Sequence, residues 1–161
     1  MDQTPAPIDQ AQALVVGMPT PEAVRQMEDM LLQMPQIDLQ TQHLLSAGLY
    51  ARTIFIPAGT VLTGALTNID NLCVAFGDIT VTTDDGPKRL TGFNVIPAMA
   101  GAKRAGVAHS DTWWVTILRT DCSTIEDAEE ALTGEAERLQ SRNEHLLGRT
   151  VWPQEFPPLG G

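Results

Sequence analysis

Residues 71–96 read NLCVAFGDITVTTDDGPKRLTGFNVI, and this segment points to antiparallel β-structure. Its β-branched and aromatic residues are interrupted by glycine signals about every 8 to 12 residues, which is the spacing of short strands and turns. Asp-Gly supplies the positive φ that a tight hairpin requires, so we predict the clearest turn at Asp84-Asp85-Gly86-Pro87. The strands predicted around it cover residues 72–76, 79–83, 88–90 and 94–96.

The same pattern extends in both directions, from about Leu49 to Leu118. Alternation with a period of two predicts further strands over residues 49–56, 61–66, 103–108 and 112–119. Many short strands at regular spacing are typical of an antiparallel sandwich or barrel. We therefore expect a mainly β fold.

Helix signals flank the predicted strands on both sides. Thr20-Pro21-Glu22 has the form of a helix start with Thr20 as the N-cap, and apolar residues at helical spacing continue until Pro35. After the strands, Ser123-Thr124-Ile125-Glu126 has the form of a capping box in which the Ser123 hydroxyl caps the helix. The C-terminal helices are expected over residues 124–132 and 133–147.

The chain divides into five segments on these grounds. Its 161 residues suit one domain, because a single core of this size can bury most of its apolar surface. Both ends carry prolines without helical periodicity, which indicates extended arms. The expected segments are an extended arm (1–19), a helical segment (20–48) that includes His43, a β-barrel (49–121), C-terminal helices (122–148) and an extended tail (149–161).

Charge, hydropathy and cysteine content argue against several classes of function. The formal net charge is −10, from 20 acidic and 10 basic side chains, so we expect no nucleic-acid partner, because phosphate binding needs a basic surface. No apolar run approaches the roughly 20 residues of a membrane helix, and the N-terminus lacks the pattern of a secretory signal. We therefore expect no membrane contact. Cys73 and Cys122 make no disulfide framework and are expected to be small buried residues in a reducing compartment.

Two stretches of the chain resemble the cupin family. Residues 49–60, LYARTIFIPAGT, followed by residues 77–81, GDITV, are similar to the first cupin signature, in which a glycine-bounded hairpin brings metal ligands into the barrel. Residues 101–116, GAKRAGVAHSDTWWVT, resemble the second half of small cupin-like proteins encoded by tailed bacteriophages and prophages. The resemblance covers about residues 49–121. It implies a cupin, or jelly-roll, β-barrel between N- and C-terminal helices and extended tails.

The positions at which that family holds a metal are emptied in this sequence. The resemblance implies a His-x-His and a downstream Glu in the first stretch and a further His in the second, because imidazoles and a carboxylate together hold a divalent transition ion. The corresponding segment here, residues 64–72, reads GALTNIDNL and contains no histidine. Asp70 alone cannot hold an ion, so we expect no metal, no cofactor and no catalytic residue.

Three side chains are candidates for lining the mouth of the barrel: Asp70, Lys103 and His109. His109 is the one imidazole within the barrel segment, and Asp111 lies two residues further on, which is the same face if both lie on one strand. The simpler alternative makes His109 a turn residue whose ring is held by a local hydrogen bond. For Lys103, the simpler alternative is solvated charge at the end of a strand.

Trp113-Trp114 places one indole on each face of its strand. One indole should enter the core, and the other needs a cover, either one of the protein's own helices or a neighbouring subunit. Apolar residues in the two arms are further candidates for contacts. The candidate interface residues are Leu14, Val15, Trp113, Trp114, Trp152 and Phe156.

Two functions compete on this sequence. The first is a non-enzymatic structural protein of a phage virion, for example a capsid decoration or cement protein, assembled in the host cytoplasm. It would form a homo-dimer or trimer and bind a phage capsid or other virion protein through the barrel surface and the arms. The second is a metal-independent small-molecule-binding or enzymatic cupin that uses the barrel mouth. The emptied ligand positions and the apolar, proline-bearing arms favour the first.

Overall fold

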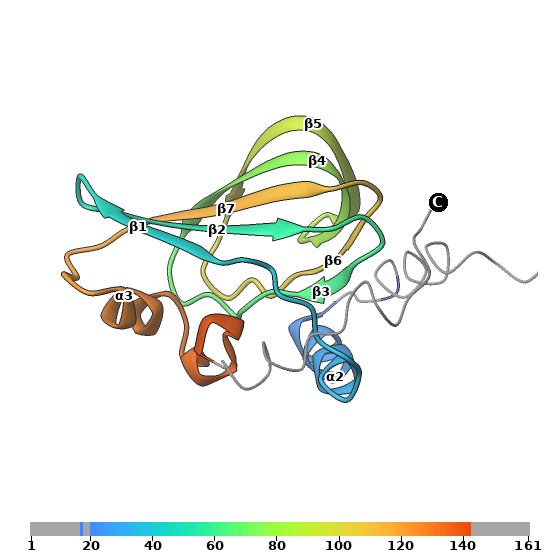
Figure 1. The fold of residues 1–161 in the computed structure, drawn as a ribbon, viewed down its shortest axis with the longest axis horizontal. Helices are drawn as coiled ribbons and strands as arrows, with labels where there is room; N and C mark the ends of the chain where they lie inside the picture. Colours follow the sequence, from blue (N-terminus) through green and yellow to red (C-terminus); the bar gives the residue numbers. More distant parts are fainter. Residues whose placement is uncertain (1–16, 18–19, 143–161) are drawn as a thin grey trace, which may run out of the picture.

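The computed structural model describes residue 17 and residues 20–142, which form a mainly β fold with two helices (Figure 1). The predicted fold class, mainly β with flanking helices, is confirmed. No helix in this part of the chain is long and apolar enough to cross a membrane. In chain order the elements are α2 (Pro21–Leu31), β1 (Gln42–Ser46), β2 (Leu49–Ile56), β3 (Val61–Thr63), β4 (Asn71–Thr83), β5 (Gly86–Ala98), β6 (Ala105–Ala108), β7 (Thr112–Arg119), α3 (Ile125–Leu132) and two short 3-10 turns, η1 (Ala136–Arg138) and η2 (Gln140–Arg142).

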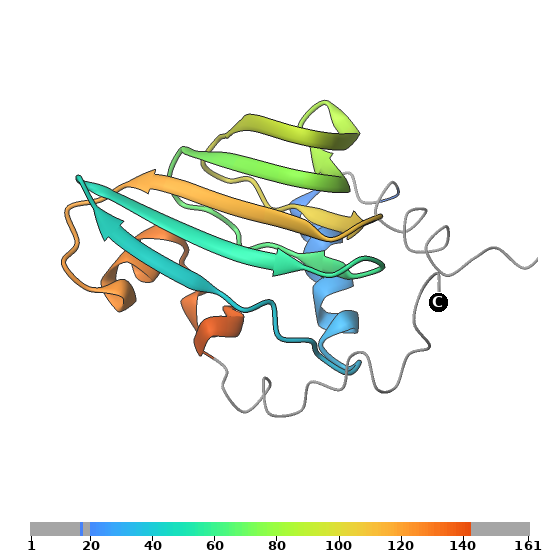
Figure 2. The same cartoon turned by 45° about the horizontal axis from the view of Figure 1, so that its top comes forward.

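The strands form one antiparallel sheet that curls over on itself (Figure 2). Their hydrogen-bonded order is β1-β2-β7-β4-β6-β3, and β5 pairs with the other edge of β4. The two ends of this order, β1 and β3, are not paired with each other within the described residues. The curled sheet is therefore a half-barrel, with β4 as the strand that joins its two halves.

The sheet bends at Gly77, where β4 changes partners. One edge of β4 pairs with β7 through residues 72–76 and with β6 through residues 79–81. Between them, Gly77 has a φ of +149°, and a Cβ added there would overlap the Thr112 hydroxyl and lie 2.7 Å from the Asp111 carbonyl oxygen. No side chain tolerates such contacts, so the bend requires glycine.

Aliphatic side chains fill the inside of the curl. Ile56, Ile79, Val81 and Ala108 are each at most 3% exposed, and Trp114 packs against them. These residues come from β2, β4, β6 and β7, which lie far apart in sequence. Full burial of a Val or Ile side chain stabilises by about 1.5 to 3 kcal/mol, so this cluster holds the two halves of the sheet together.

The two helices cover separate parts of the sheet and leave one surface uncovered (Figure 1). Helix α2 packs through Val24 and Met27 against β6. Helix α3 packs through Ala128 and Leu132 against Tyr50 of β2. Neither helix contributes to the surface of β2, β7, β4 and β5 that faces away from these clusters.

The β4–β5 hairpin confirms the predicted turn, and its strands are longer than predicted. Gly86 has a φ of +98° and closes a two-residue loop formed by Asp84 and Asp85. The four short strands predicted here merge into two strands of 13 residues each. The reason is that Gly77 and Gly92 pair with each other inside the ladder and do not end it.

The helical segment predicted over residues 20–48 is wrong in its second half. Helix α2 begins where predicted, and the Thr20 hydroxyl accepts a hydrogen bond from the Ala23 N–H at 3.2 Å as an N-cap. Residues 42–46 then form β1, which pairs with β2, so His43 lies in a strand. The exposure of β1 alternates residue by residue, the pattern of an edge strand with one face toward the protein.

Two predictions for the C-terminal helices are also wrong in detail. The N-cap of α3 is Thr124, whose hydroxyl accepts the N–H of the residue three positions on at 3.2 Å, so the cap is displaced by one residue from Ser123. The continuous helix predicted from Thr133 is replaced by η1 and η2. Thr133 is extended and bridges to Thr67, and Gly134 follows it, so the chain does not turn directly into a second helix.

Candidate interaction surface

The outward surface of the sheet carries twelve side chains that we call the outer face. Directly opposite residues of an antiparallel pair point to the same side, so the register of β2, β7, β4 and β5 defines rows across these strands. Every position except Thr53 is apolar, and none is charged. The three rows are Phe55-Trp113-Phe76-Phe93, Thr53-Val115-Val74-Val95 and Ala51-Ile117-Leu72-Pro97.

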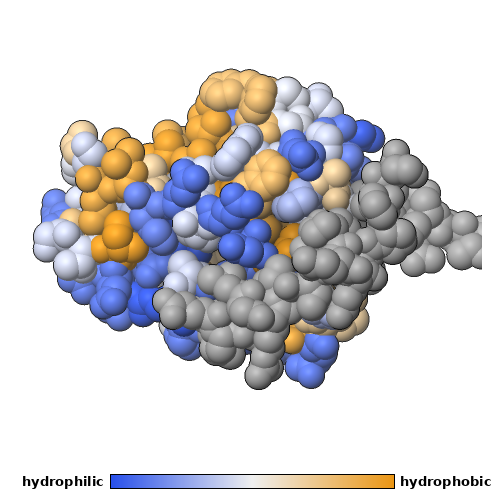
Figure 3. All heavy atoms as spheres, viewed as in Figure 1, coloured by the Kyte–Doolittle hydropathy of each residue, from blue (hydrophilic) through white to orange (hydrophobic). Residues whose placement is uncertain are grey.

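Much of the outer face is exposed. The exposed fraction is 68% for Phe93, 56% for Phe76 and Val95, 50% for Leu72 and 41% for Trp113. Figure 3 shows hydrophobic residues gathered along the upper left of the molecule, with mostly hydrophilic residues at the upper right. Soluble monomers rarely expose a contiguous apolar patch larger than a few hundred Å². The outer face is therefore the strongest candidate for a functional site.

Aromatic contacts connect the strands of the outer face. The ring centroids of Phe55 and Trp113 lie 4.9 Å apart at an interplanar angle of 54°. Those of Phe76 and Phe93 lie 6.5 Å apart at 56°. Tilted ring pairs at these separations are favourable. One aromatic row therefore crosses four strands, at the end of the outer face next to the bend at Gly77.

The two tryptophans lie on opposite faces of β7, as the sequence predicts. Trp114 packs inside the curl, and Trp113 belongs to the outer face. Both helices pack on other surfaces, so neither of them covers Trp113. Of the two covers considered from the sequence, a helix of the protein itself is therefore not provided by α2 or α3, the helices of the described residues.

Lys103 belongs to a buried ionic cluster at the base of α2. Its side chain is 1% exposed, and its ammonium lies 2.9 Å from Glu28 Oε2 and 3.3 Å from Glu135 Oε2 and donates to the Gly64 carbonyl at 2.9 Å. Arg138 Nε pairs with the other Glu28 oxygen at 2.8 Å. Burial lowers the pKa of Lys103, and the hydrogen bond to Glu28 opposes that shift. All three ammonium hydrogens have acceptors, so the cluster joins elements and offers Lys103 no free donor for a ligand.

A second buried ionic cluster surrounds Glu129 of α3. Its carboxylate is 4% exposed, lies 3.0 Å from Arg52 Nη1 and 3.0 Å from Arg142 Nε, and accepts a hydrogen bond from the Ser141 hydroxyl at 2.5 Å. Burial alone would raise the pKa of Glu129, but the hydrogen bonds from Ser141 and Arg142 and the charge of Arg52 outweigh it and lower that pKa. This cluster fixes α3 and the 3-10 segment against β2.

The other two predicted pocket residues hold loops in place. Asp70 Oδ1 accepts a hydrogen bond from the Ala100 N–H at 2.8 Å. His109 lies between β6 and β7, the turn position that the simpler alternative predicts. Its Nε2 is 2.7 Å from Thr80 Oγ1 of β4, which is 29 residues away and so is not the local partner of that prediction. The hydrogen bonds of Asp70, Lys103 and His109 thus run to three separate places and do not draw the three side chains into one site.

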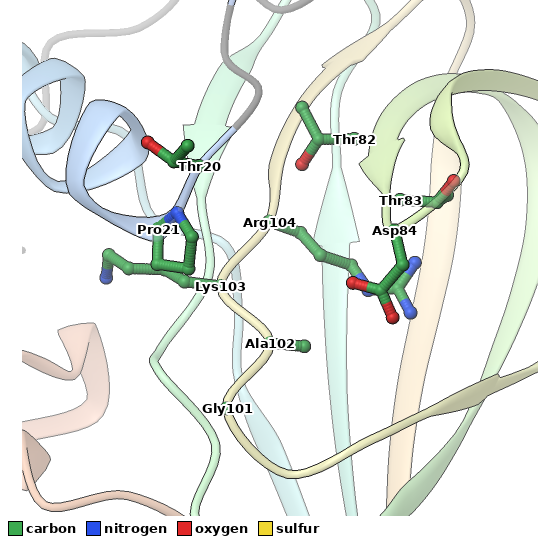
Figure 4. A pocket seen from close by; sticks show the side chains of 9 residues that line it. All are labelled: Thr20, Pro21, Thr82, Thr83, Asp84, Gly101, Ala102, Lys103 and Arg104. Atoms are coloured by element: carbon green, nitrogen blue, oxygen red, sulfur yellow. The ribbon is translucent and has the colours of Figure 1, made fainter.

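A depression of about 160 Å³ lies between the start of α2, the end of β4 and the loop before β6 (Figure 4). In Figure 4 the side chains of Lys103 and Arg104 point in opposite directions from this loop. Thr82 Oγ1 accepts the first N–H of β6 at 3.0 Å, and Arg104 Nη2 donates to a carbonyl of β5 at 3.1 Å. The lining residues are Thr20, Pro21, Thr82, Thr83, Asp84, Gly101, Ala102, Lys103 and Arg104. Because these polar groups serve the fold, the depression is the weaker candidate.

Metal and thiol chemistry find little support in the described residues. No group of three or more His, Cys, Asp or Glu side chains among them is arranged to hold a metal ion. Cys73 and Cys122 are free thiols. Burial raises the pKa of the Cys73 thiol, with the charge of Arg104 acting against it. At 4% exposure Cys73 packs as a small apolar residue, as predicted.

Several predicted contact residues lie outside the described residues. The predicted arm (1–19, apart from residue 17), the tail (149–161) and residues 143–148 are all in this category. The interface candidates among them are Leu14, Val15, Trp152 and Phe156.

Sequence reasoning missed most of the outer face, including Phe76 and Phe93. A signal for it exists in the sequence. The β4 segment LCVAF, residues 72–76, is apolar at every position, so both faces of this strand must be apolar. Half-exposed strands alternate with polar residues instead.

Comparisons with known proteins add a structural likeness only. No family model matches this chain, and no curated protein matches it. Similar solved structures include a protein from Neisseria meningitidis, with 12% identity over 60% of this chain and 96% of that one and a TM-score of 0.43. They also include the Cupin_2 domain of an XRE family transcriptional regulator from Enterobacter cloacae (10% identity, 51% and 96% covered, TM-score 0.43). A third is a cupin-2 domain containing protein from Shewanella frigidimarina (9% identity, 58% and 91% covered, TM-score 0.42).

Two of these three structures are cupin domains, the family that the sequence resembles, and the likeness concerns the fold alone. Identities and TM-scores this low carry no argument about activity, ligand or partner. The fold class rests on the strands and their register. The functional assignment rests on the surface of this chain.

Proposed function

We propose that this chain is a non-enzymatic assembly protein that acts through contacts made by its outer face. The observation that carries the proposal is an uncharged, largely apolar sheet surface, up to 68% exposed at Phe93, on a chain with a formal net charge of −10. Covering such a surface with another protein contributes about 25 cal/mol per Å² of apolar area, which is offset in part by the loss of freedom on association. The charged remainder of the surface keeps the chain in solution until it is assembled.

The assembly in which we place the chain is a tailed-phage virion, where it would serve as a capsid decoration or cement protein. The resemblance of residues 101–116 to small phage-encoded cupin-like proteins supports this placement. The absence of histidine from residues 64–72 supports a role in binding over a role in catalysis. The proposed partners are a second copy of the chain and a capsid or other virion protein.

Mass spectrometry of purified particles tests the virion role. Particles from a host strain that carries the gene are purified on a density gradient, and the chain is quantified against the major shell protein. We expect many copies of the chain per particle. Particles that lack the chain, from a strain in which it is expressed, would rule out this role.

The competing function, a metal-independent small-molecule-binding or enzymatic cupin, makes a different prediction. A ligand held by the native state raises the unfolding temperature in a saturable way. A thermal-shift screen of the full chain against a metabolite library should therefore give no saturable shift if the chain acts by assembly. A saturable shift that is lost in Arg104→Ala would transfer the assignment to the depression of Figure 4.

A further inference from the structure

We propose that the outer face binds a second copy of this chain, face to face, to form a closed dimer with a two-fold axis. The inference rests on the proposed function, because it takes the outer face as the contact surface. It adds that the partner bound there is a second copy of the chain. A face that meets its own copy closes at two subunits, whereas a ring of three needs two different surfaces. The sequence left dimer and trimer open, and the geometry points to the dimer.

Charge is the first reason to choose a second copy. Two copies that each carry a formal net charge of −10 repel each other, and contact through acidic surfaces would bring like charges together. The outer face is the exception, since none of its twelve positions is charged. It is thus a surface through which two identical acidic chains can meet without unpaired charge in the contact.

Exposed area is the second reason. With about 200 Å² for a full aromatic side chain, the exposed fractions of Trp113, Phe76 and Phe93 correspond to about 330 Å². Val95 and Leu72 extend this area, and so do Leu44 and Leu49, which lie on the same side of the sheet at its β1 margin. Together these side chains approach the roughly 800 Å² that each partner buries in a standard interface. Arg119, the partner of Leu49 in the register, places a charge at that margin, outside the twelve positions.

The shape of the outer face suits a sheet-on-sheet contact. Two sheets pack stably face to face at about 10 Å, with the side chains of both inner faces between them. The aromatic row through Trp113 and Phe76 provides large, stiff side chains, of the kind that dominate interface energies. In a dimer with a two-fold axis, the second copy contributes the same aromatic row to the contact.

Contact through the free edge of β5 is a less suitable way to form a dimer. Pro87 and Pro97 lie near the two ends of β5 and have no N–H to donate to a neighbouring strand. Lys88 and Arg89 follow Pro87 with side chains that are 53% and 54% exposed. Proline and charge are the features that keep edge strands from pairing, so the outer face is a more suitable contact than the edge of β5.

Sedimentation velocity of the full chain over a concentration series tests the dimer. The wild type should sediment as a species of twice 17.4 kDa at about 10 µM. Phe93→Glu places a charge in the aromatic row of the apolar contact and should weaken association at least about tenfold. Val95→Glu, in the next row, should act in the same way. Both native side chains are more than half exposed, so far-UV circular dichroism and urea unfolding should show the fold unchanged.

Met34→Glu is the matched control. Met34 is 48% exposed and lies just after α2, away from the sheet, so the same charge is introduced at an exposed apolar residue outside the outer face. This variant should remain dimeric. Dissociation of Met34→Glu to the same extent as Phe93→Glu would overturn the assignment of the contact to the outer face.

The other occupants give distinct results. A wild-type chain that stays monomeric up to about 100 µM overturns the dimer and would leave a part of the same chain or another protein as the cover. If that monomer is nevertheless found in particles, the inference fails and the proposed virion role survives. A dimer that Phe93→Glu dissociates, but that is absent from particles, supports the inference and refutes the virion role.

Discussion

Lys103 carries a positive charge into a place where 1% of its side chain is exposed, and its stabilising effect depends on two carboxylates. Lys103→Met removes the charge and leaves Glu28 and Glu135 with their arginine partners, and Glu28 also with the Thr63 hydroxyl. We expect a loss of about 3 kcal/mol in the free energy of unfolding, measured by urea titration, because one member of a buried ion cluster is removed. Lys88→Met makes the same change at a side chain that is 53% exposed and should alter stability by less than about 0.5 kcal/mol.

Glu129 makes the free energy of unfolding depend on pH in the acidic range. Its pKa is below the ordinary value of 4.5 in the folded state, so the unfolded chain binds the proton more readily. The contribution of Glu129 is therefore complete above the unfolded pKa and is lost as the pH falls through the lower, folded pKa. Glu129→Gln should give a shallower fall in stability between about pH 5 and pH 3, followed by urea unfolding at several pH values. Glu130→Gln is the control, because Glu130 is 63% exposed; an equal change there would contradict the assignment.

Single residues were predictable from the sequence only where their role is set by local neighbours. The alternation at Trp113-Trp114 correctly placed one indole on each face of β7. For Lys103 the sequence offers a place at the barrel mouth or, more simply, solvated charge, and neither anticipates its burial, because Glu28 and Glu135 lie 75 and 32 residues away in the sequence. The residues next to Lys103 in the sequence therefore do not indicate that it belongs to a buried ionic cluster.

At the scale of elements, the bend of the sheet depends on Gly77. Gly77→Ala would bring a Cβ within 2.7 Å of the Asp111 carbonyl oxygen, which belongs to the backbone and cannot move aside. We expect a loss of about 3 kcal/mol, seen as a lower midpoint in urea. Gly92→Ala is the matched control, since Gly92 also has a positive φ, of +70°, but has open space around it, and should lose only about 1 kcal/mol. Equal losses in both variants would mean that the positive φ, and not the contact between the added Cβ and the backbone, causes the loss of stability.

The start of α3 offers a test of the N-cap that the structure assigns. Thr124→Ala removes the hydroxyl that accepts the Asp127 N–H at 3.2 Å and should cost about 1 kcal/mol in thermal or urea unfolding. Ser123→Ala should have almost no effect, because Ser123 precedes the cap. The opposite order of effects would restore the capping box predicted from the sequence.

The sequence predicted most elements and failed where glycine or threonine was ambiguous. Gly77 and Gly92 were interpreted as ends of strands, yet they are paired positions inside β4 and β5. Ser123 and Thr124 are both favourable N-cap residues, and the position at which the helix starts selects Thr124. The segment 42–46 is too short and too polar to be predicted as a strand from its own sequence. Its hydrogen-bonded pairing with β2 stabilises the strand instead.

At the scale of the whole molecule, the outer face exists only because four strands share one register. The sequence shows that residues 72–76 are apolar on both sides, but it does not show which strands lie beside them. The pairing of Phe76 with both Trp113 and Phe93 turns three separate apolar strands into one surface. The same limit applies to the predicted barrel mouth, since the sequence does not show that Asp70, Lys103 and His109 have hydrogen-bond partners in three different places.

The dependence of self-association on salt follows from the contrast between an uncharged contact and an acidic chain. Two copies with a formal net charge of −10 repel at long range, while the outer face itself holds no ion pair to be screened. Raising the salt concentration from about 20 mM to about 500 mM shortens the screening length and should lower the dimer Kd several-fold. Sedimentation equilibrium across a NaCl series measures this effect. A dimer held together by charged pairs would weaken over the same series, and that result would place the contact on a different surface from the outer face.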